Sequence, residues 1–195
     1  MATSEASNNK HHKRKRLVRL IGRLLSEIGD NPEREGLKET PERVAKAYAE
    51  WFRGYERPPF EVKKFKTKYN GIIARVGIPF QSFCEHHMAR YSGVIHFAYI
   101  PSGHVLGLSK IIRLAQHWAA RLTIQEDLTA EITAQFMAVL GTKDVAVVVS
   151  ALHSCESTRG VKVANVPTVT ASMGGKFFTE KALRDEFYQL VNLEK

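Results

Sequence analysis

Two separated clusters of metal-binding residue types constrain this chain more than any other feature. One is the run Cys84-Glu85-His86-His87, and the other is His153-Ser154-Cys155, which holds the second of the chain's two cysteines. A catalytic zinc site commonly takes three Cys or His ligands and leaves its fourth tetrahedral position to water. Cys84, His87 and Cys155 would complete such a set, with His86 and His153 left as acid/base groups beside the metal. The fold then has to bring the two clusters together.

Two other interpretations of the cysteines stay open at this point. Free cysteines in globular proteins are often small buried hydrophobic residues. A disulfide is the third option, which a cytosolic location would disfavour because that compartment keeps thiols reduced. Each cysteine has a histidine within two residues, and this pattern favours the metal site.

The composition predicts one soluble domain. The chain has 195 residues, of which 44% are hydrophobic and 25% are charged, and these are ordinary proportions for a globular protein. No apolar run approaches the ~20 residues needed to span a bilayer, and no signal-peptide segment follows the basic N-terminus. We expect a cytoplasmic protein without a membrane partner.

The net charge of +9 is concentrated in part at the N-terminus. Residues 1–16 hold five Lys or Arg against one acidic residue, in a stretch with too few apolar residues to fold. This predicts a disordered basic tail over 1–16. The charge that remains suits an anionic small substrate as well as it suits a polymer.

Hydrophobic periodicity predicts two helices, then strands, then a mixture of both. The first helices are expected over residues 17–28 and 40–54, the second with Thr40 as N-cap candidate and Pro41 in its first turn. Strands are expected over 60–68, 72–76, 78–83, 94–100, 145–149 and 168–172, and further helices over 109–122, 124–140 and 180–193. The first metal-binding cluster therefore lies between two adjacent strands.

Two groups of cations suggest an anion site. Ser109 is an N-cap candidate, and Lys110 and Arg113 lie three residues apart in the first turn that follows it. Free backbone N–H groups and cations at a helix N-terminus favour phosphate. Arg43 lies in the first turn of its helix, where a positive charge is unfavourable, although an ordinary surface arginine is the plainer interpretation.

Together with other motifs, the two metal-binding clusters give the chain a resemblance to GTP cyclohydrolase I, from about Gly36 to the C-terminus. The motifs that carry the resemblance are Thr40-Pro41-Glu42-Arg43, Cys84-Glu85-His86-His87, Ala98-Tyr99-Ile100-Pro101, Gly107-Leu108-Ser109-Lys110, Gln125-Glu126, His153-Ser154-Cys155 with Thr158-Arg159-Gly160, and Ser172-Met173-Gly174-Gly175. Several ordered motifs at family-like separations are more specific than any one of them.

The resemblance implies an α+β tunnelling fold, an antiparallel β-sheet with two helices on one face, preceded by N-terminal helices. After the tail we expect a single catalytic domain over 17–195, made of N-terminal helices over 17–56 and a tunnelling-fold core over 57–195. Subunits of the family join edge to edge into pentameric barrels that stack as a homodecamer, with active sites between subunits. Such joining pairs strand edges that a small open sheet leaves exposed.

The family's reaction converts GTP and water to 7,8-dihydroneopterin 3'-triphosphate and formate, the first step of folate and pterin biosynthesis. By resemblance, Cys84, His87 and Cys155 are ligands of Zn²⁺, which would activate water for attack on C8 of guanine. His86 is similar to the histidine that exchanges a proton with the imidazole nitrogen as the ring opens. His153 is similar to the one that acts after deformylation, near the ribose. Both roles suit a group that titrates near neutral pH.

The resemblance also assigns substrate contacts. Glu126 matches the guanine-binding carboxylate, whose two oxygens face the N1–H and amine donors that adenine lacks, and Gln125 lies beside it. Ser109 falls near the ribose. The triphosphate contacts fall on Lys110, Arg113, Arg159 and Arg43.

The chain departs from the family's pattern in three places. Met88-Ala89-Arg90-Tyr91 is more polar than the apolar segment usual after the histidines. Asp127 stands where the family usually has arginine. This difference changes the local salt bridges and leaves the expected contact with the base in place. The N-terminal helical extension is short. None of these removes a ligand or an acid/base residue.

Two alternative functions compete with this one. Another tunnelling-fold enzyme, acting on a pterin or deazaguanine, is disfavoured because its substrate would not need Lys110, Arg113 and Arg159. A zinc-stabilised nucleic-acid-binding module would need a fourth protein ligand, for which the adjacent His86 is awkwardly placed. The folded part also lacks a basic stripe interleaved with exposed aromatic residues, so we expect no nucleic-acid partner.

Overall fold

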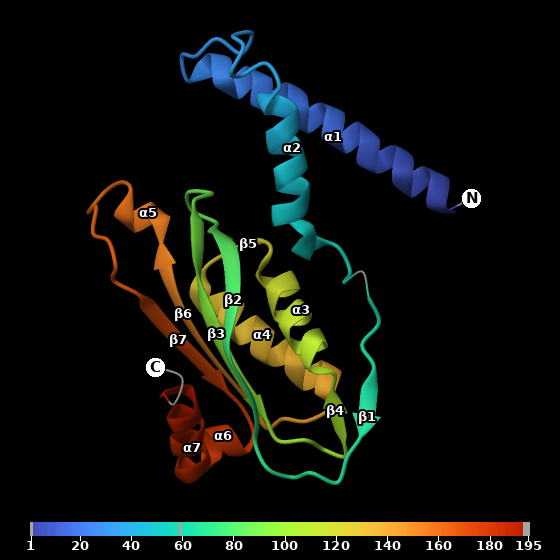
Figure 1. Ribbon diagram of the computed structural model, residues 1–195, viewed down its shortest axis with the longest axis vertical. Helices are drawn as coiled ribbons and strands as arrows, with labels where there is room; N and C mark the ends of the chain where they lie inside the picture. The colour runs from blue at the N-terminus through green and yellow to red at the C-terminus, as the bar shows by residue number, and fades with distance from the viewer. Residues whose placement is uncertain (1, 59, 193–195) are drawn as a thin grey trace. The chain divides into compact units, whose positions relative to one another are not determined.

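The computed structural model describes residues 2–58 and 60–192, with side chains from His11 onward (Figure 1). The chain divides into two compact units, one ending at Arg53 and one beginning at Gly54, and each is described by itself. Within these described ranges, no helix combines the length and the apolar character that crossing a membrane requires.

The N-terminal unit is a pair of helices, α1 (Ala2–Glu27) and α2 (Thr40–Trp51). The structure continues α1 back to Ala2, through the segment for which the composition predicts a disordered tail. No Gly or Pro interrupts residues 2–21, and the Lys and Arg residues there are good helix formers. An ion pair between Arg14 and Glu42, 2.7 Å long, joins the two helices.

Two predicted helix starts differ by one or two residues from the observed ones. Glu39 is the N-cap of α2, so Thr40 is its first helical residue, and Pro41 lies in the first turn as expected. Gly107 is the N-cap of α3 (Leu108–Ala119), which places Ser109 inside the first turn. Neither cap makes a side-chain hydrogen bond, so neither start carries the capping side chain from which a helix start is predicted.

A five-stranded sheet forms the centre of the second unit. Its strands, in spatial order, are β5 (Leu122–Thr123), β2 (Ile73–Cys84), β3 (Arg90–Tyr99), β6 (Val145–His153) and β7 (Thr168–Met173). All neighbours are antiparallel except β5, which runs parallel to β2. A separate antiparallel pair consists of β1 (Lys64–Lys66) and β4 (His104–Leu106).

The two strands predicted over 72–76 and 78–83 are one continuous strand. A shift in register between Arg75 and Ile78 interrupts the pairing of β2 with β3, and Gly77 at this point has a left-handed φ of 71°. A bulge of this kind bends a strand without ending it. The glycine therefore looks like a strand boundary in the sequence although the chain continues.

Helices α3 and α4 (Gln125–Leu140) cover one face of the sheet (Figure 1). The Phe136 ring of α4 stacks on Phe97 of β3 at a centroid distance of 4.1 Å and meets Trp118 of α3 edge-on at 5.0 Å. Full burial of each such side chain stabilises the fold by about 1.5–3 kcal/mol. This packing gives the α+β arrangement expected from the sequence, an antiparallel sheet with two helices on one face.

A smaller core lies on the other face of the same sheet. Alternate residues of a strand point to opposite faces, so Ala98 and Val148 point away from the main core and belong to a second cluster with Phe177 and Phe187. The latter belong to α6 (Lys176–Thr179) and α7 (Lys181–Asn192). The remaining short helices are η1 (Arg53–Tyr55) and α5 (Ser154–Ser157).

Gly93 lies where β3 passes closest to β6, and we expect Gly93→Ala to destabilise the protein strongly. An added Cβ would lie 1.9 Å from the Ser150 carbonyl oxygen and 2.6 Å from Ala151 Cα. These are backbone atoms of a paired strand, so relief requires the strands to separate, at a cost of about 3 kcal/mol. Urea unfolding measures the change. Gly107→Ala is the control, because its Cβ would meet only ordinary contacts from 3.7 Å, and an equal loss in both variants would contradict the prediction.

Candidate active site

The ends of β2 and β6 bring the two metal-binding clusters together. β2 ends at Cys84, and β6 ends at His153, immediately before the short helix α5 that carries Cys155. Only β3 separates these strands, and its residue Tyr91 is in register with Ser82 on one side and His153 on the other. The convergence expected from the sequence is therefore confirmed.

The geometry of the cluster fits a zinc ion. One ligand atom each from Cys84, His87 and Cys155 lies within 4.8 Å of the others, and the distance from Cys84 Sγ to His87 Nδ1 is 4.0 Å. Ligand atoms around tetrahedral zinc lie about 3.5–3.8 Å apart, so small side-chain rotations would bring these three atoms to the distances that zinc requires. Both thiols are free, which excludes the disulfide alternative. Among the described residues, no second group of Cys, His, Asp and Glu has such an arrangement.

The chemistry of the two sulfurs also fits a bound cation. Cys84 is buried and Cys155 is half-buried. Burial, together with the neighbouring Cys84, raises the pKa of the Cys155 thiol above its ordinary value. Two adjacent thiolates are unfavourable without a positive charge between them, and a divalent metal supplies that charge.

A tight turn after β2 holds His87 close to Cys84. The Cys84 N–H donates to the Ala89 carbonyl and the Met88 N–H donates to the Cys84 carbonyl, both at 2.8 Å. Met88 adopts a left-handed φ of 52° to close the turn. His86 projects from the same turn, with its Nδ1 3.8 Å from Cys84 Sγ. Both histidines are exposed and open to a substrate.

His153 is the half-buried histidine of the site. Its ring stacks on Tyr91 at 4.4 Å with an interplanar angle of 7°, and its Nε2 lies 2.8 Å from Gln125 Oε1. Burial lowers the pKa of His153, an effect that the negative charge of Glu126 partly opposes. Glu126 is exposed in the first turn of α4, so a free carboxylate lies at the same end of the sheet as the metal cluster.

Within the second unit, the predicted triphosphate residues do not all gather at this end. Arg159 does, because its Nη1 lies 2.8 Å from His87 Nε2. Arg43 belongs to the N-terminal unit, where it pairs with Glu39. Ser109 is exposed in the first turn of α3 and Arg113 is exposed in the second. Lys110, also in the first turn, lies over the Phe60 ring, 4.7 Å from its centroid.

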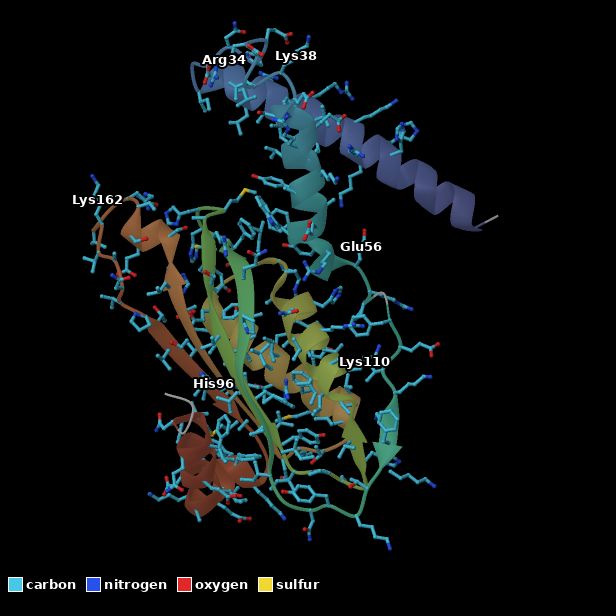
Figure 2. All side chains as sticks on the ribbon, in the orientation of Figure 1. Arg34, Lys38, Glu56, His96, Lys110 and Lys162 are labelled. Carbon is cyan, nitrogen blue, oxygen red and sulfur yellow. The ribbon has the colours of Figure 1, made fainter. Side chains whose placement is uncertain are left out.

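The first turn of α3 lies far from the metal cluster of its own chain. Past the C-terminal end of α3, the Arg121 carbonyl accepts a bond from the Phe83 N–H, next to Cys84. The side chain of Gln116 bonds the Pro79 carbonyl, so the helix runs back along β2, away from the cysteine. A rise of about 1.5 Å per residue then separates Lys110 from the metal end by at least about 15 Å. Figure 2 shows Lys110 at this remote end of α3 and Lys162, in the loop after α5, at the other end of the sheet.

Comparison with known families supplies the deciding observation. The model of the family described as GTP cyclohydrolase I matches residues 17–192. The chain belongs to the GTP cyclohydrolase I family. GTP cyclohydrolase I activity, a hydrolysis in folate and pterin biosynthesis, follows from this membership. The fold is accordingly the tunnelling fold, and the cluster of Cys84, His87 and Cys155 is the zinc site.

Relatives named GTP cyclohydrolase 1 match almost the whole chain. The protein from Maricaulis maris is 42% identical over 172 residues, which are 86% of this chain and 84% of that protein. The protein from Clostridium kluyveri is 40% identical over 185 residues, 94% and 98% of the two chains. Among solved structures, the archaeosine synthase QueF-Like in its apo form is 18% identical with a TM-score of 0.38, over 56% of this chain and 99% of that one. This last likeness is too distant to bear on function.

Sequence reasoning missed the contribution of Tyr91. The segment Met88-Ala89-Arg90-Tyr91 stands out in the sequence only as unusually polar for the family. The structure shows that Tyr91 is 1% exposed and stacked on His153. The signal that could have located it is strand alternation. Tyr91 is the second residue of β3, whose buried residues include Tyr91, Ile95, Phe97 and Tyr99 at alternate positions, and β3 lies beside the strand that ends on His153.

Proposed function

We propose that the protein converts GTP and water to 7,8-dihydroneopterin 3'-triphosphate and formate at sites shared between neighbouring subunits. The observation that carries the proposal is the cluster of Cys84, His87 and Cys155, with His153 and Glu126 at the same end of the sheet. When bound there, zinc lowers the pKa of water to about 7 and so supplies a nucleophile for guanine C8.

Three residues around the metal have separate roles in base recognition and proton transfer. The Glu126 carboxylate accepts hydrogen bonds from guanine N1–H and the exocyclic amine, which fixes the base and rejects adenine. His86, exposed beside the ligand turn, exchanges a proton with the imidazole nitrogen as the ring opens. His153 acts after formate has left, near the ribose. Histidine suits both steps because it gains and loses a proton near neutral pH.

The cations bind the triphosphate, and they come from more than one subunit. Arg159 lies at the metal cluster, whereas Lys110 lies at least about 15 Å and Arg113 about 12 Å along α3 from it, beyond the reach of a lysine or arginine side chain. A neighbouring subunit that presents its own α3 completes the site, with Ser109 near the ribose. Arg43 of the N-terminal unit is a further triphosphate contact.

We propose that the complete assembly is a homodecamer of two stacked pentamers. The five-stranded sheet has β5 at one edge and β7 at the other, and joining such edges between subunits removes unpaired backbone groups. The cytoplasm is the proposed location, because its reducing conditions keep the cysteine ligands available to zinc.

Incubation of the purified protein with GTP tests the reaction. We expect formate and the pterin, assayed by its fluorescence after oxidation, to appear in equal amounts. Bound GTP with no formate would contradict the proposed reaction and favour another substrate of the same fold.

Mixing two inactive variants tests the shared site. Cys155→Ala lacks a metal ligand, and Arg113→Ala lacks a proposed triphosphate contact. After the subunits are dissociated and reassembled together, random pairing should restore about a quarter of the sites, because each site takes its halves from different chains. Each variant reassembled alone is the control. No recovery in assembled mixtures would show that one chain supplies both halves.

A further inference from the structure

Gln125 is a deeply buried polar residue near the metal centre. It opens α4 and is only 1% exposed. Its side-chain nitrogen Nε2 lies 3.1 Å from the Val149 carbonyl, 2.9 Å from the Thr168 carbonyl and 3.1 Å from Thr170 Oγ1. Its oxygen Oε1 lies 2.8 Å from His153 Nε2. The amide therefore connects α4 with strands β6 and β7 and with the catalytic histidine.

These partners leave the amide only one orientation. Backbone carbonyls accept hydrogen bonds and cannot donate them, so the NH₂ group has to face Val149 and Thr168. The two N–H donors are then fully used by three acceptors. The oxygen is the only group that can face His153, and it can only accept.

A second chain of hydrogen bonds supports the same assignment. The Thr129 hydroxyl donates to the Gln125 backbone carbonyl at 2.7 Å, so its oxygen is free to accept from the Thr170 hydroxyl, 2.6 Å away. Thr170 in turn accepts from the Gln125 amide. Every member of this network is satisfied in one consistent arrangement.

The network fixes His153 in one tautomer. Because Gln125 Oε1 accepts, the neutral His153 ring carries its proton on Nε2 and keeps a lone pair on Nδ1. Tyr91, 1% exposed, stacks on the ring at 4.4 Å and holds its plane. The hydrogen bond and the stack together leave the ring little freedom to turn.

We propose that Gln125 is a positioning residue for His153, acting with Tyr91, and does not itself contact the guanine base. This inference rests on the proposed function, in which His153 takes part in the reaction. Consecutive residues of a helix point about 100° apart, so Glu126 faces solvent while Gln125 faces the core. Recognition of the base then falls to Glu126, and the rate of the steps at His153 depends on Gln125.

A double-mutant cycle between Gln125→Met and His153→Ala tests the proposal. We expect Gln125→Met alone to lower kcat for GTP by about 10- to 100-fold, since positioned acid/base groups contribute about 10²–10⁴. The KM for GTP should stay within about twofold, because a positioning residue adds no ground-state contact. In the His153→Ala background the same substitution should change kcat by less than about twofold, since its effect acts through the absent ring.

Two further variants separate the effect on His153 from a general disturbance of α4. Gln125→Glu keeps an oxygen for His153 and loses the amide donors, so it should retain more kcat than Gln125→Met. Thr133→Val is the matched control, because it removes a buried side-chain bond of α4, from Thr133 Oγ1 to the Thr129 carbonyl at 2.8 Å, without contacting His153. It should leave kcat and KM unchanged. Zinc content per chain confirms that each variant assembles its metal site.

One kinetic result would overturn the inference in favour of a direct contact between Gln125 and the base. It is a rise in the KM for GTP that exceeds the fall in kcat and that persists in the His153→Ala background.

If Gln125→Met does not yield zinc-loaded protein, Tyr91→Leu replaces it in the double-mutant cycle, because Tyr91 also holds the His153 ring. Additive effects of Tyr91→Leu and His153→Ala on kcat would equally overturn the inference. Wild-type protein that released no formate from GTP would instead contradict the proposed function. The two failures are therefore distinguishable.

Discussion

Replacement of Cys155 by alanine is expected to lower GTP turnover by at least about 10³-fold, because metal-activated water is lost with the ligand. The Cys155 sulfur is one of the three ligand atoms that lie within 4.8 Å of one another. Cys84 and His87 alone leave two open positions on a zinc ion, and binding weakens accordingly. Zinc measured per chain after gel filtration should fall well below one, in parallel with formate release.

The control for this variant is Ser157→Ala, in the same short helix α5. It should keep both zinc and turnover, which separates loss of the ligand from disturbance of the helix. Cys155→Ala protein that held one zinc per chain and released formate at the wild-type rate would show that Cys155 is not a ligand.

Replacement of Glu126 by glutamine is expected to lower kcat/KM for GTP by about two orders of magnitude or more. The carboxylate offers two acceptor oxygens to two guanine donors, whereas an amide offers one oxygen and sets an NH₂ group against a donor. Hydrogen bonds to a charged group contribute about 1.5–3 kcal/mol each. Steady-state kinetics of formate release measure the effect.

Inosine triphosphate provides a second measurement on the same variant. It lacks the exocyclic amine, so as a competitor it should bind the wild-type protein more weakly than GTP does. The Glu126→Gln variant should lose most of this preference, because the group that distinguishes the two bases is gone. Asp127→Asn, at the next exposed carboxylate of α4, is the matched control. A Glu126→Gln variant with unchanged kcat/KM and preference would remove Glu126 from base recognition.

Local patterns in the sequence favour the metal centre, and the family resemblance then gives its ligands. Cys84 and His87 belong to one turn, and Cys155 follows a buried apolar strand, so ligand chemistry and strand ends together indicated where three ligands would meet. The helices over 109–122 and 124–140 were also predictable, because their apolar spacing follows the helical period. The division into a tail and one catalytic domain stays a prediction.

The remaining features depend on partners that are distant in the sequence. Its position beside Glu126 predicts a substrate contact for Gln125, whereas its bonds to Thr168 and Thr170 exist only once β7 has paired with β6 and are not visible in the sequence. The distance between Lys110 and the metal centre is likewise set by the direction in which α3 packs along β2. A single residue, Gly77, made one bulged strand look like two.

Zinc titration of the metal-free protein tests the central claim most directly, with formate and pterin release from GTP measured at each point. If Cys84, His87 and Cys155 form the catalytic centre, activity rises in proportion to bound zinc and saturates at one zinc per chain, with the two products always equal. Metal-free protein that released formate at the full rate, or zinc-loaded protein that released none, would contradict this account of the site.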